Sequence, residues 1–384
     1  MISLIEKRDI HWLRLSAINL IVFIVILGLI EIAARTIFDQ ETEPGLEAFI
    51  TSRPPPFHED TSFEEVVKQF NNSCNYPSPE IVLHEGLPTY TQDFSCGGIT
   101  LHDGYRLTTN QPQDSLFKVH VFGGSTVWGL GSIDRNTLPS TLQRQLNEYF
   151  PEKFLVTNHG FESLVAKQQL ERLSRLKISP DDVVIFYDGG NDIWLGGLYG
   201  TPSGTIIGYN QESRLVILVF NFKIWLSKNI ATYSLLSRLK NRFLLGENNG
   251  DLSCPISETE AARNSEAGSD LYLKYIEDAD NLVKRSGGKF FHFFQPTLLA
   301  LENPTEYEQI VIDKTPCYKE AQAAYRIYKF RYAQLSQQNN NAYDFSDYFS
   351  GRDLFFDWIH VGARGNQIMG QNIFNTLGSA EIDN

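Results

Sequence analysis

The first residue that could do chemistry is a serine in a glycine turn directly after an apolar run. The segment reads Gly123-Gly124-Ser125-Thr126-Val127. Glycine lets a backbone bend sharply and approach a ligand closely, so Ser125 could serve as a nucleophile toward an acyl group. Glycine–serine turns are also common without any reaction. Because Val127 stands where the GxSxG nucleophile elbow has its second glycine, the spacing does not indicate an α/β-hydrolase fold.

A base for such a nucleophile stands near the C-terminus. The segment Asp357-Trp358-Ile359-His360 comes just before an amphipathic run. An aspartate three residues before a histidine can reach the imidazole within one turn, fix its tautomer and stabilise the cation that forms when it takes a proton. The alternative is that both side chains serve a helix N-terminus. Of the eight histidines, His360 is the one placed as a catalytic base should be.

An amide side chain follows another apolar run, in Asp188-Gly189-Gly190-Asn191-Asp192. The Asn191 amide could donate a hydrogen bond to an oxyanion that develops during acyl transfer. The same residues are also good turn formers. This segment alone therefore leaves both interpretations open.

Taken together and in this order, these segments resemble the SGNH hydrolase family, also called GDSL-like esterases. The resemblance covers roughly residues 118–377, and the GGNDIW and DWIH stretches are its most specific parts. It implies that Ser125 is the nucleophile, that His360 is its general base, that Asp357 orients His360, and that Asn191 belongs to the oxyanion hole. It also implies ester hydrolysis through a covalent acyl-enzyme.

Two positions depart from the family pattern. The second block reads NHGFES, with Ser163 where many members have glycine. In this family that block supplies a backbone N–H to the oxyanion hole, so the resemblance assigns Ser163 and Gly160 to that role. Gly124 stands where the name-giving motif has aspartate. Neither change removes a reacting group, but both leave the substrate range open.

Alternating apolar and amphipathic runs must position these residues. Short apolar runs followed by longer amphipathic ones are typical of a parallel sheet covered by helices on both faces. Strands are expected at 118–122, 154–157, 182–187 and 289–294, and helices at 138–150, 165–177, 271–285, 319–335 and 365–377. The expected fold is a three-layer α/β/α sandwich with a flavodoxin-like sheet of about five parallel strands. Its ligand should bind at the carboxyl ends of the strands.

The domain organisation follows from shifts in composition. Residues 15–34 are almost wholly apolar and long enough to cross a bilayer. Basic residues precede this run and acidic ones follow it, so the positive-inside rule places residues 1–14 in the cytoplasm. We expect a stalk at 35–60, an irregular lead-in at 61–117 and the hydrolase domain at 118–384, with a cap-like insertion at 195–269. A cleaved signal peptide is the alternative for the apolar run.

This placement predicts a single-pass membrane protein whose hydrolase domain is periplasmic or extracellular. The partners expected are the lipid bilayer, through the apolar run, and an ester substrate. Binding to nucleic acid is excluded, because a net charge of -13 and a pI near 5.1 describe a surface that repels phosphate backbones. No phosphate-binding loop and no HExxH motif is present in the sequence, so we expect neither a cofactor nor a metal.

The four cysteines are widely spaced and form no CxxC pair. Outside the cytoplasm they are expected to form disulfides, and pairing Cys74 with Cys96 and Cys254 with Cys317 closes the most local loops. Four unpaired buried thiols are the alternative.

The function expected from the sequence is serine-dependent hydrolysis of an acyl or acetyl ester on a carbohydrate or lipid. Two alternatives stay open. The same residues could transfer the acyl group to a glycan hydroxyl, or the chain could hold a glycan in the cleft without reacting.

Overall fold

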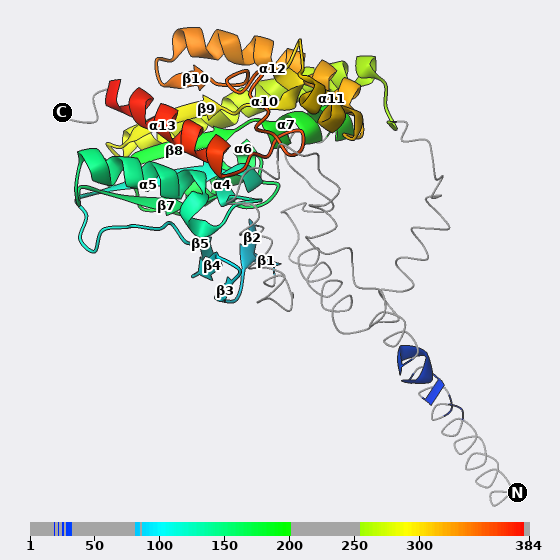
Figure 1. The fold of residues 1–384 in the computed structure, drawn as a ribbon, viewed down its shortest axis with the longest axis horizontal. Helices are drawn as coiled ribbons and strands as arrows, with labels where there is room; N and C mark the ends of the chain where they lie inside the picture. The colour runs from blue at the N-terminus through cyan, green and yellow to red at the C-terminus, as the bar shows by residue number, and fades with distance from the viewer. Residues whose placement is uncertain are drawn as a thin grey trace, which may run out of the picture. The chain divides into compact units, whose positions relative to one another are not determined.

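A computed structural model of the chain describes residues 81–84, 87–200 and 254–379, together with helical positions between 19 and 32 (Figure 1). The chain divides into two compact units, one of residues 1–45 and 213–251 and one of residues 46–212 and 252–384. Within the described residues, no helix is both long and apolar enough to cross a membrane. Most of the expected span at 15–34, the stalk at 35–60 and the middle of the expected cap, 201–253, lie outside the described residues.

Five parallel strands form the centre of the larger unit. They are β6 (Phe117–Gly123), β7 (Phe154–Asn158), β8 (Val183–Asp188), β9 (Lys289–Phe294) and β10 (Ala342–Asp344). Their spatial order is β10-β9-β8-β6-β7, and every neighbouring pair is parallel. In order of appearance along the chain this is the 2-1-3-4-5 arrangement of flavodoxin-like sheets.

The sheet is nevertheless larger than predicted. Three short strands, β5 (Tyr105–Arg106), β4 (Ile99–His102) and β3 (Phe94–Cys96), extend it beyond β7 in antiparallel fashion and make it an eight-stranded mixed sheet. The prediction of five parallel strands only is therefore wrong, and part of the lead-in at 61–117 is regular. Strands of two to four residues are too short to show the alternation from which strands are predicted.

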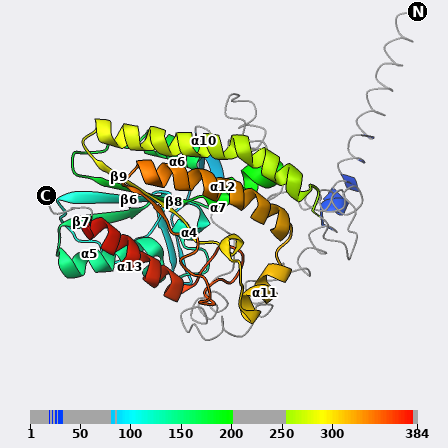
Figure 2. The same ribbon diagram turned by 90° about the horizontal axis from the view of Figure 1, so that it is seen from above.

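Helices cover both faces of the sheet, as the sandwich prediction requires (Figure 2). One face carries α5 (Leu138–Tyr149) and α13 (Ala363–Ser379), and the other carries α6 (Ala166–Leu173), α10 (Glu258–Arg285) and α12 (Tyr318–Gln338). The strands serve both layers because successive side chains point to opposite faces. In β8, for example, Val183, Ile185 and Tyr187 join the first core, and Val184 and Phe186 join the second.

The remaining elements are short. They are β1 (Ile81–His84), β2 (Leu87–Tyr90), α4 (Ser125–Trp128), η2 (Asp134–Asn136), α7 (Gly190–Ile193), η3 (Trp194–Leu198), η4 (Leu298–Ala300) and α11 (Glu306–Asp313). The strands β1 and β2 form a separate antiparallel pair.

Helix α10 begins well before the predicted start at residue 271, so the inserted segment is shorter than 195–269. The hydroxyl of Ser257 accepts a hydrogen bond from the N–H of Glu260 and caps the helix. Gly268 lies within the helix because the space is needed for packing: a Cβ there would come within 2.5 Å of the Tyr328 hydroxyl and 3.6 Å of Gly196 Cα. Glycine usually weakens a helix, but Gly268 allows close packing of this helix against its neighbours.

A disulfide joins Cys254 to Cys317, as the sequence predicted, and so connects the segment before α10 to the start of α12. Cys96 is also disulfide-bonded, and Cys74 lies outside the described residues. In the part of the chain that is described, no cysteine is free, so the alternative of four unpaired thiols is wrong.

Candidate active site

The nucleophile turn connects β6 to α4 and requires both of its glycines. A Cβ at Gly123 would lie 2.3 Å from Val127 Cγ2 and 2.5 Å from the carbonyl oxygen of Tyr187. A Cβ at Gly124 would lie 2.4 Å from Nδ2 of Asn191. In this chain a side chain at position 124 would therefore displace Asn191. Ser125 begins α4 at the carboxyl end of β6.

Ser125, His360 and Asp357 form a continuous hydrogen-bonded chain. Ser125 Oγ lies 2.6 Å from His360 Nε2, and His360 Nδ1 lies 2.7 Å from Asp357 Oδ2. The other carboxylate oxygen, Oδ1, accepts hydrogen bonds from the backbone N–H groups of Ile359 at 2.9 Å and His360 at 2.7 Å. Ser125 and His360 are 235 residues apart in sequence.

The environment of Asp357 keeps its carboxylate ionised. Burial acts to raise its pKa, but attraction to His360 and the three hydrogen bonds outweigh burial and hold the pKa of Asp357 below its usual value. An ionised carboxylate beside Nδ1 favours the tautomer with its proton on Nδ1. In that tautomer the Nε2 lone pair faces the Ser125 hydroxyl and can accept its proton.

Asn191 lies beside this group, in α7 directly after β8. Its Nδ2 donates a hydrogen bond to the carbonyl oxygen of Leu164 at 2.9 Å and lies against Gly124, the residue before the nucleophile. A side-chain amide has two N–H donors, so the bond to Leu164 leaves one for a ligand. Strands β6 and β8 are neighbours at the point where the strand order reverses, which is where ligands bind in open α/β sheets.

Gly160, in the second block (NHGFES), does not have the role that we predicted for it. Its N–H already donates to Asn158 Oδ1 at 2.9 Å, and a Cβ on Gly160 would lie 2.3 Å from the backbone nitrogen of Trp128. Gly160 is therefore needed for close packing under α4, and its assignment to the oxyanion hole is wrong. Sequence could not show this, because it depends on where the Asn158 side chain turns.

Ser163 has a backbone conformation that is compatible with the oxyanion role expected from the sequence. Its φ of 59° lies in the left-handed region, where glycine is favoured, and its side chain is exposed. Among the described residues, its backbone N–H has no hydrogen-bond partner, so the donor is available to an oxyanion. The strained backbone also explains why glycine is the easier residue at this position.

The residue after Asn191 ties its turn to the second block. The Asp192 carboxylate accepts the N–H of Ala166, the first residue of α6, at 3.1 Å and 3.3 Å. Burial and the nearby charge of Asp188 raise the pKa of Asp192 well above its usual value. This aspartate therefore holds the start of α6 in place rather than contacting the reacting groups.

The structure adds residues that we did not single out from the sequence. The rings of Trp194 and Trp358 stack with centroids 4.6 Å apart and planes 24° from parallel, which joins the Asn191 segment to the Asp357–His360 segment. Burial raises the pKa of Glu162, and electrostatic attraction to His360 and Arg106 opposes this shift. Gln295, buried after β9, contacts the nucleophile turn. A buried polar residue directly after a strand is the signal that could have identified Gln295.

Replacing Asn191 with alanine should lower kcat about 100-fold or more, because loss of one oxyanion donor typically has that effect. KM for a p-nitrophenyl ester should change little if the bond forms mainly in the transition state. Asn264→Ala is the matched control, since its amide also donates to a backbone carbonyl, that of Gly197 at 3.2 Å, but takes no part in the site. If kcat is unchanged in Asn191→Ala, the hypothesis that Asn191 is an oxyanion donor is wrong.

Two buried histidines, His159 in the second block and His120 in β6, make stability depend on pH. His120 Nδ1 lies 2.9 Å from His159 Nε2, and the His159 ring stacks on Phe122 with centroids 4.5 Å apart. Burial lowers the pKa of His120 to about 4, against the attraction of Asp182, and lowers that of His159 well below its usual value. Both histidines are therefore neutral in the folded protein at neutral pH.

The free energy of unfolding should fall as pH drops from about 6.5 to about 4, because in this window the unfolded chain binds protons that the folded chain does not. This contribution is fully present above the unfolded pKa. In His120→Gln the fall should be shallower, whereas His84→Gln, which changes an exposed histidine in β1, should follow the wild-type curve. Denaturant titrations at a series of pH values measure this; parallel curves for all three proteins would contradict it.

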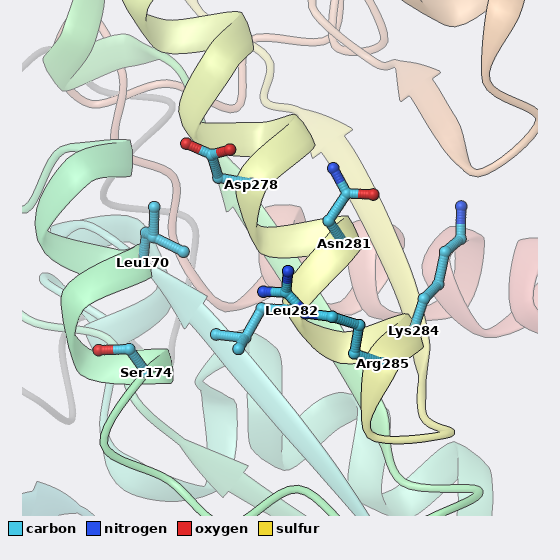
Figure 3. Close-up of a pocket in the computed structure, with 7 residues that line it drawn as sticks. All are labelled: Leu170, Ser174, Asp278, Asn281, Leu282, Lys284 and Arg285. Carbon is cyan, nitrogen blue, oxygen red and sulfur yellow. The ribbon is translucent and has the colours of Figure 1, made fainter.

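Other features of the described residues do not add to the site. A hollow between α6 and α10 (Figure 3) is lined by Leu170, Ser174, Asp278, Asn281, Leu282, Lys284 and Arg285. Both helices end there, before β8 and β9 begin, so the hollow lies at the opposite edge of the sheet from Ser125.

Two groups of side chains in the described part of the chain are close enough to hold a metal, and neither includes a site residue. Cys254 and Cys317 with Glu320 form one group, but their sulfurs are already in the disulfide. Asp93, His102 and Asp103 form the other and are exposed.

No family model matches the chain, and no curated protein matches it in sequence. Similar solved structures include a member of the lipolytic protein G-D-S-L family from Veillonella parvula, at 12% identity, covering 67% of this chain and 97% of that chain with a TM-score of 0.36. An acetyl xylan esterase is similar at 13% identity, 69% of this chain and 100% of that chain, with a TM-score of 0.37. A variant acetyl-xylooligosaccharide esterase from Geobacillus Stearmophilus is similar at 13% identity, 69% and 95%, with a TM-score of 0.38. Sequence identities and TM-scores this low do not identify the reaction of this chain. Its function must therefore be inferred from the residues of the site.

Proposed function

We propose that this protein is a serine-dependent ester hydrolase of the SGNH type. The observation that carries the proposal is the hydrogen-bonded chain from Ser125 through His360 to Asp357, with distances of 2.6 Å and 2.7 Å. A hydroxyl, an imidazole and a carboxylate in this order are the arrangement that activates a serine for acyl transfer. Asn191 beside them supplies a donor for the negative charge that develops on the substrate oxygen.

The reaction proceeds in two steps. Ser125 Oγ attacks the ester carbonyl carbon while His360 Nε2 takes the hydroxyl proton, and collapse of the tetrahedral intermediate breaks the bond to the alcohol, which leaves with that proton. Water then attacks the acyl-serine, gives a proton to Nε2, and the carboxylic acid leaves as the proton returns to Ser125 Oγ. Asn191 and the N–H groups of Ser125 and Ser163 are the proposed oxyanion donors.

The proposed substrates are acyl or acetyl esters of a carbohydrate or lipid. The stacked Trp194–Trp358 pair supports this class, because partly exposed indole rings next to the reacting groups offer an apolar surface for a sugar ring or an acyl chain. The test is hydrolysis of p-nitrophenyl esters from acetate to decanoate and of acetylated sugars, followed by acid release. Transfer of the acyl group to an added sugar, without net release of acid, would instead show that the protein is an O-acyltransferase.

A serine-reactive phosphonate separates an enzyme from a protein that only binds esters. Covalent labelling of the folded chain at Ser125 supports the hydrolase. A folded chain that binds an acetylated sugar but takes no label and releases no acid would overturn the proposal.

We also propose that residues 15–34 anchor the protein, with residues 1–14 in the cytoplasm and the hydrolase domain periplasmic or extracellular. The charge asymmetry around the apolar run and the Cys254–Cys317 disulfide support this placement. Digestion of intact cells by an added protease, with loss of the hydrolase domain but not of a tag at the N-terminus, tests it. Protection of the domain in intact cells would contradict it.

A further inference from the structure

One buried amide contacts the two turns that carry Ser125 and Asn191. Gln295 directly follows β9, and only 3% of its surface is exposed. Its Oε1 accepts a hydrogen bond from the hydroxyl of Thr126, the residue after the nucleophile, at 2.8 Å. Its Nε2 lies against Gly190, where a Cβ would come within 2.5 Å of it.

The backbone of Gln295 is fixed as well. Its N–H donates to the carbonyl oxygen of Asp188, the last residue of β8, at 2.9 Å. The side chain therefore starts from a point held by the end of β8 and reaches across to α4. At the far end of the side chain, the hydrogen bond with Thr126 sets the direction of the amide.

The position of these turns is not set by the sheet alone. Ser125 and Asn191 follow β6 and β8, which are paired only as far as Gly123 with Tyr187. Beyond that pair the two turns leave the ladder, so side chains must hold them in register. Displacing a reacting group by about 1 Å can lower a rate about 100-fold. A brace between the turns therefore bears directly on catalysis.

We propose that Gln295 is a positioning residue for the reaction proposed above: through its hydrogen bond with Thr126 it holds the nucleophile turn in place relative to the Asn191 turn. A buried amide is costly unless it is hydrogen-bonded, and an apolar residue would fill the same space without that cost. The side chain acts through Thr126 and Gly190 and does not contact the reacting atoms. The inference rests on the proposed function, because it concerns the same site.

The test removes the bond from each side. Thr126→Val keeps the shape of the side chain and loses the hydroxyl, Gln295→Met keeps most of the length and loses the amide, and Thr126→Ser keeps the donor. With a p-nitrophenyl ester, Thr126→Val and Gln295→Met should each lower kcat about 10-fold or more, with KM within about twofold of wild type. The double variant should be no slower than the slower single variant, because both remove the same bond. Thr126→Ser should stay within about threefold of wild type.

Tyr325→Phe is the matched structural control. Its hydroxyl donates to Ser346 Oγ at 2.9 Å, so this bond, too, joins two side chains from separate segments of the chain. This variant should lower the melting temperature without changing kcat. The inference would be overturned if kcat stayed within about twofold of wild type in both Thr126→Val and Gln295→Met. It would also be overturned if the two losses in kcat multiplied in the double variant. In either case, activity of the wild type would leave the proposed function unaffected. A wild type that hydrolyses no ester and takes no phosphonate label would instead overturn the proposed function itself.

Discussion

Ser125→Ala should lower kcat for ester hydrolysis by roughly 10⁶-fold, the loss typical when the serine of a triad is removed. The physical reason is the 2.6 Å contact between Ser125 Oγ and His360 Nε2, since without the hydroxyl no acyl-enzyme can form. The residual rate should come from the oxyanion donors acting on water. Initial rates with p-nitrophenyl acetate, together with mass spectrometry after phosphonate treatment, measure both the rate and the covalent adduct.

Ser174→Ala is the control for this experiment. Ser174 is an exposed serine whose hydroxyl donates to the carbonyl oxygen of Glu171, so its loss should leave both rate and labelling unchanged. Circular dichroism should show that both variants fold. Labelling that persists in Ser125→Ala, or a rate equal to that of wild type, would rule out Ser125 as the nucleophile.

Asp357→Asn should lower kcat by about 10⁴-fold while the fold is kept. The asparagine oxygen can still accept the N–H groups of Ile359 and His360, but its NH2 would face His360 Nδ1 and donate to it. That bond favours the tautomer with the proton on Nε2, which cannot accept a proton from Ser125. The loss should therefore appear in kcat rather than in KM.

The control here is Asp347→Asn, which changes an exposed aspartate paired with Lys329 at 3.7 Å. Its kcat should match that of wild type, since an exposed ion pair contributes little. Melting temperatures should be measured for both variants, so that loss of activity can be separated from loss of fold. Retention of most of the activity in Asp357→Asn would mean that another group orients His360.

Local patterns predicted much of the fold. The strand expected at 289–294 is β9 (Lys289–Phe294), and the helix expected at 138–150 is α5 (Leu138–Tyr149), because each run is long enough to show its period. The antiparallel strands β3 to β5 were missed because they are too short to show alternation, and their attachment to the parallel strands depends on a distant contact, that of Arg106 with Asn158. Likewise, the part of α10 before residue 271 contains Gly268, whose packing against Tyr328 is not visible in the local sequence.

The candidate site divides in the same way. The contact between Asp357 and His360 is local, three residues along the chain, so their spacing predicts it. The oxyanion role of Gly160 was wrong, because its N–H is taken by a side chain whose direction no spacing reveals. Gln295 was missed for a related reason, since its partner Thr126 is 169 residues away.

By itself the sequence determined which chemical groups are present, their order, and the alternation of strands and helices that carries Ser125, Asn191 and His360 to one edge of a sheet. Only the tertiary structure decided which groups meet: that Nε2 of His360 lies 2.6 Å from Ser125, that Asn191 lies against Gly124, and that Gly160 serves packing. The reason is physical. Backbone periodicity is set by near neighbours, whereas contacts across hundreds of residues depend on how whole elements pack.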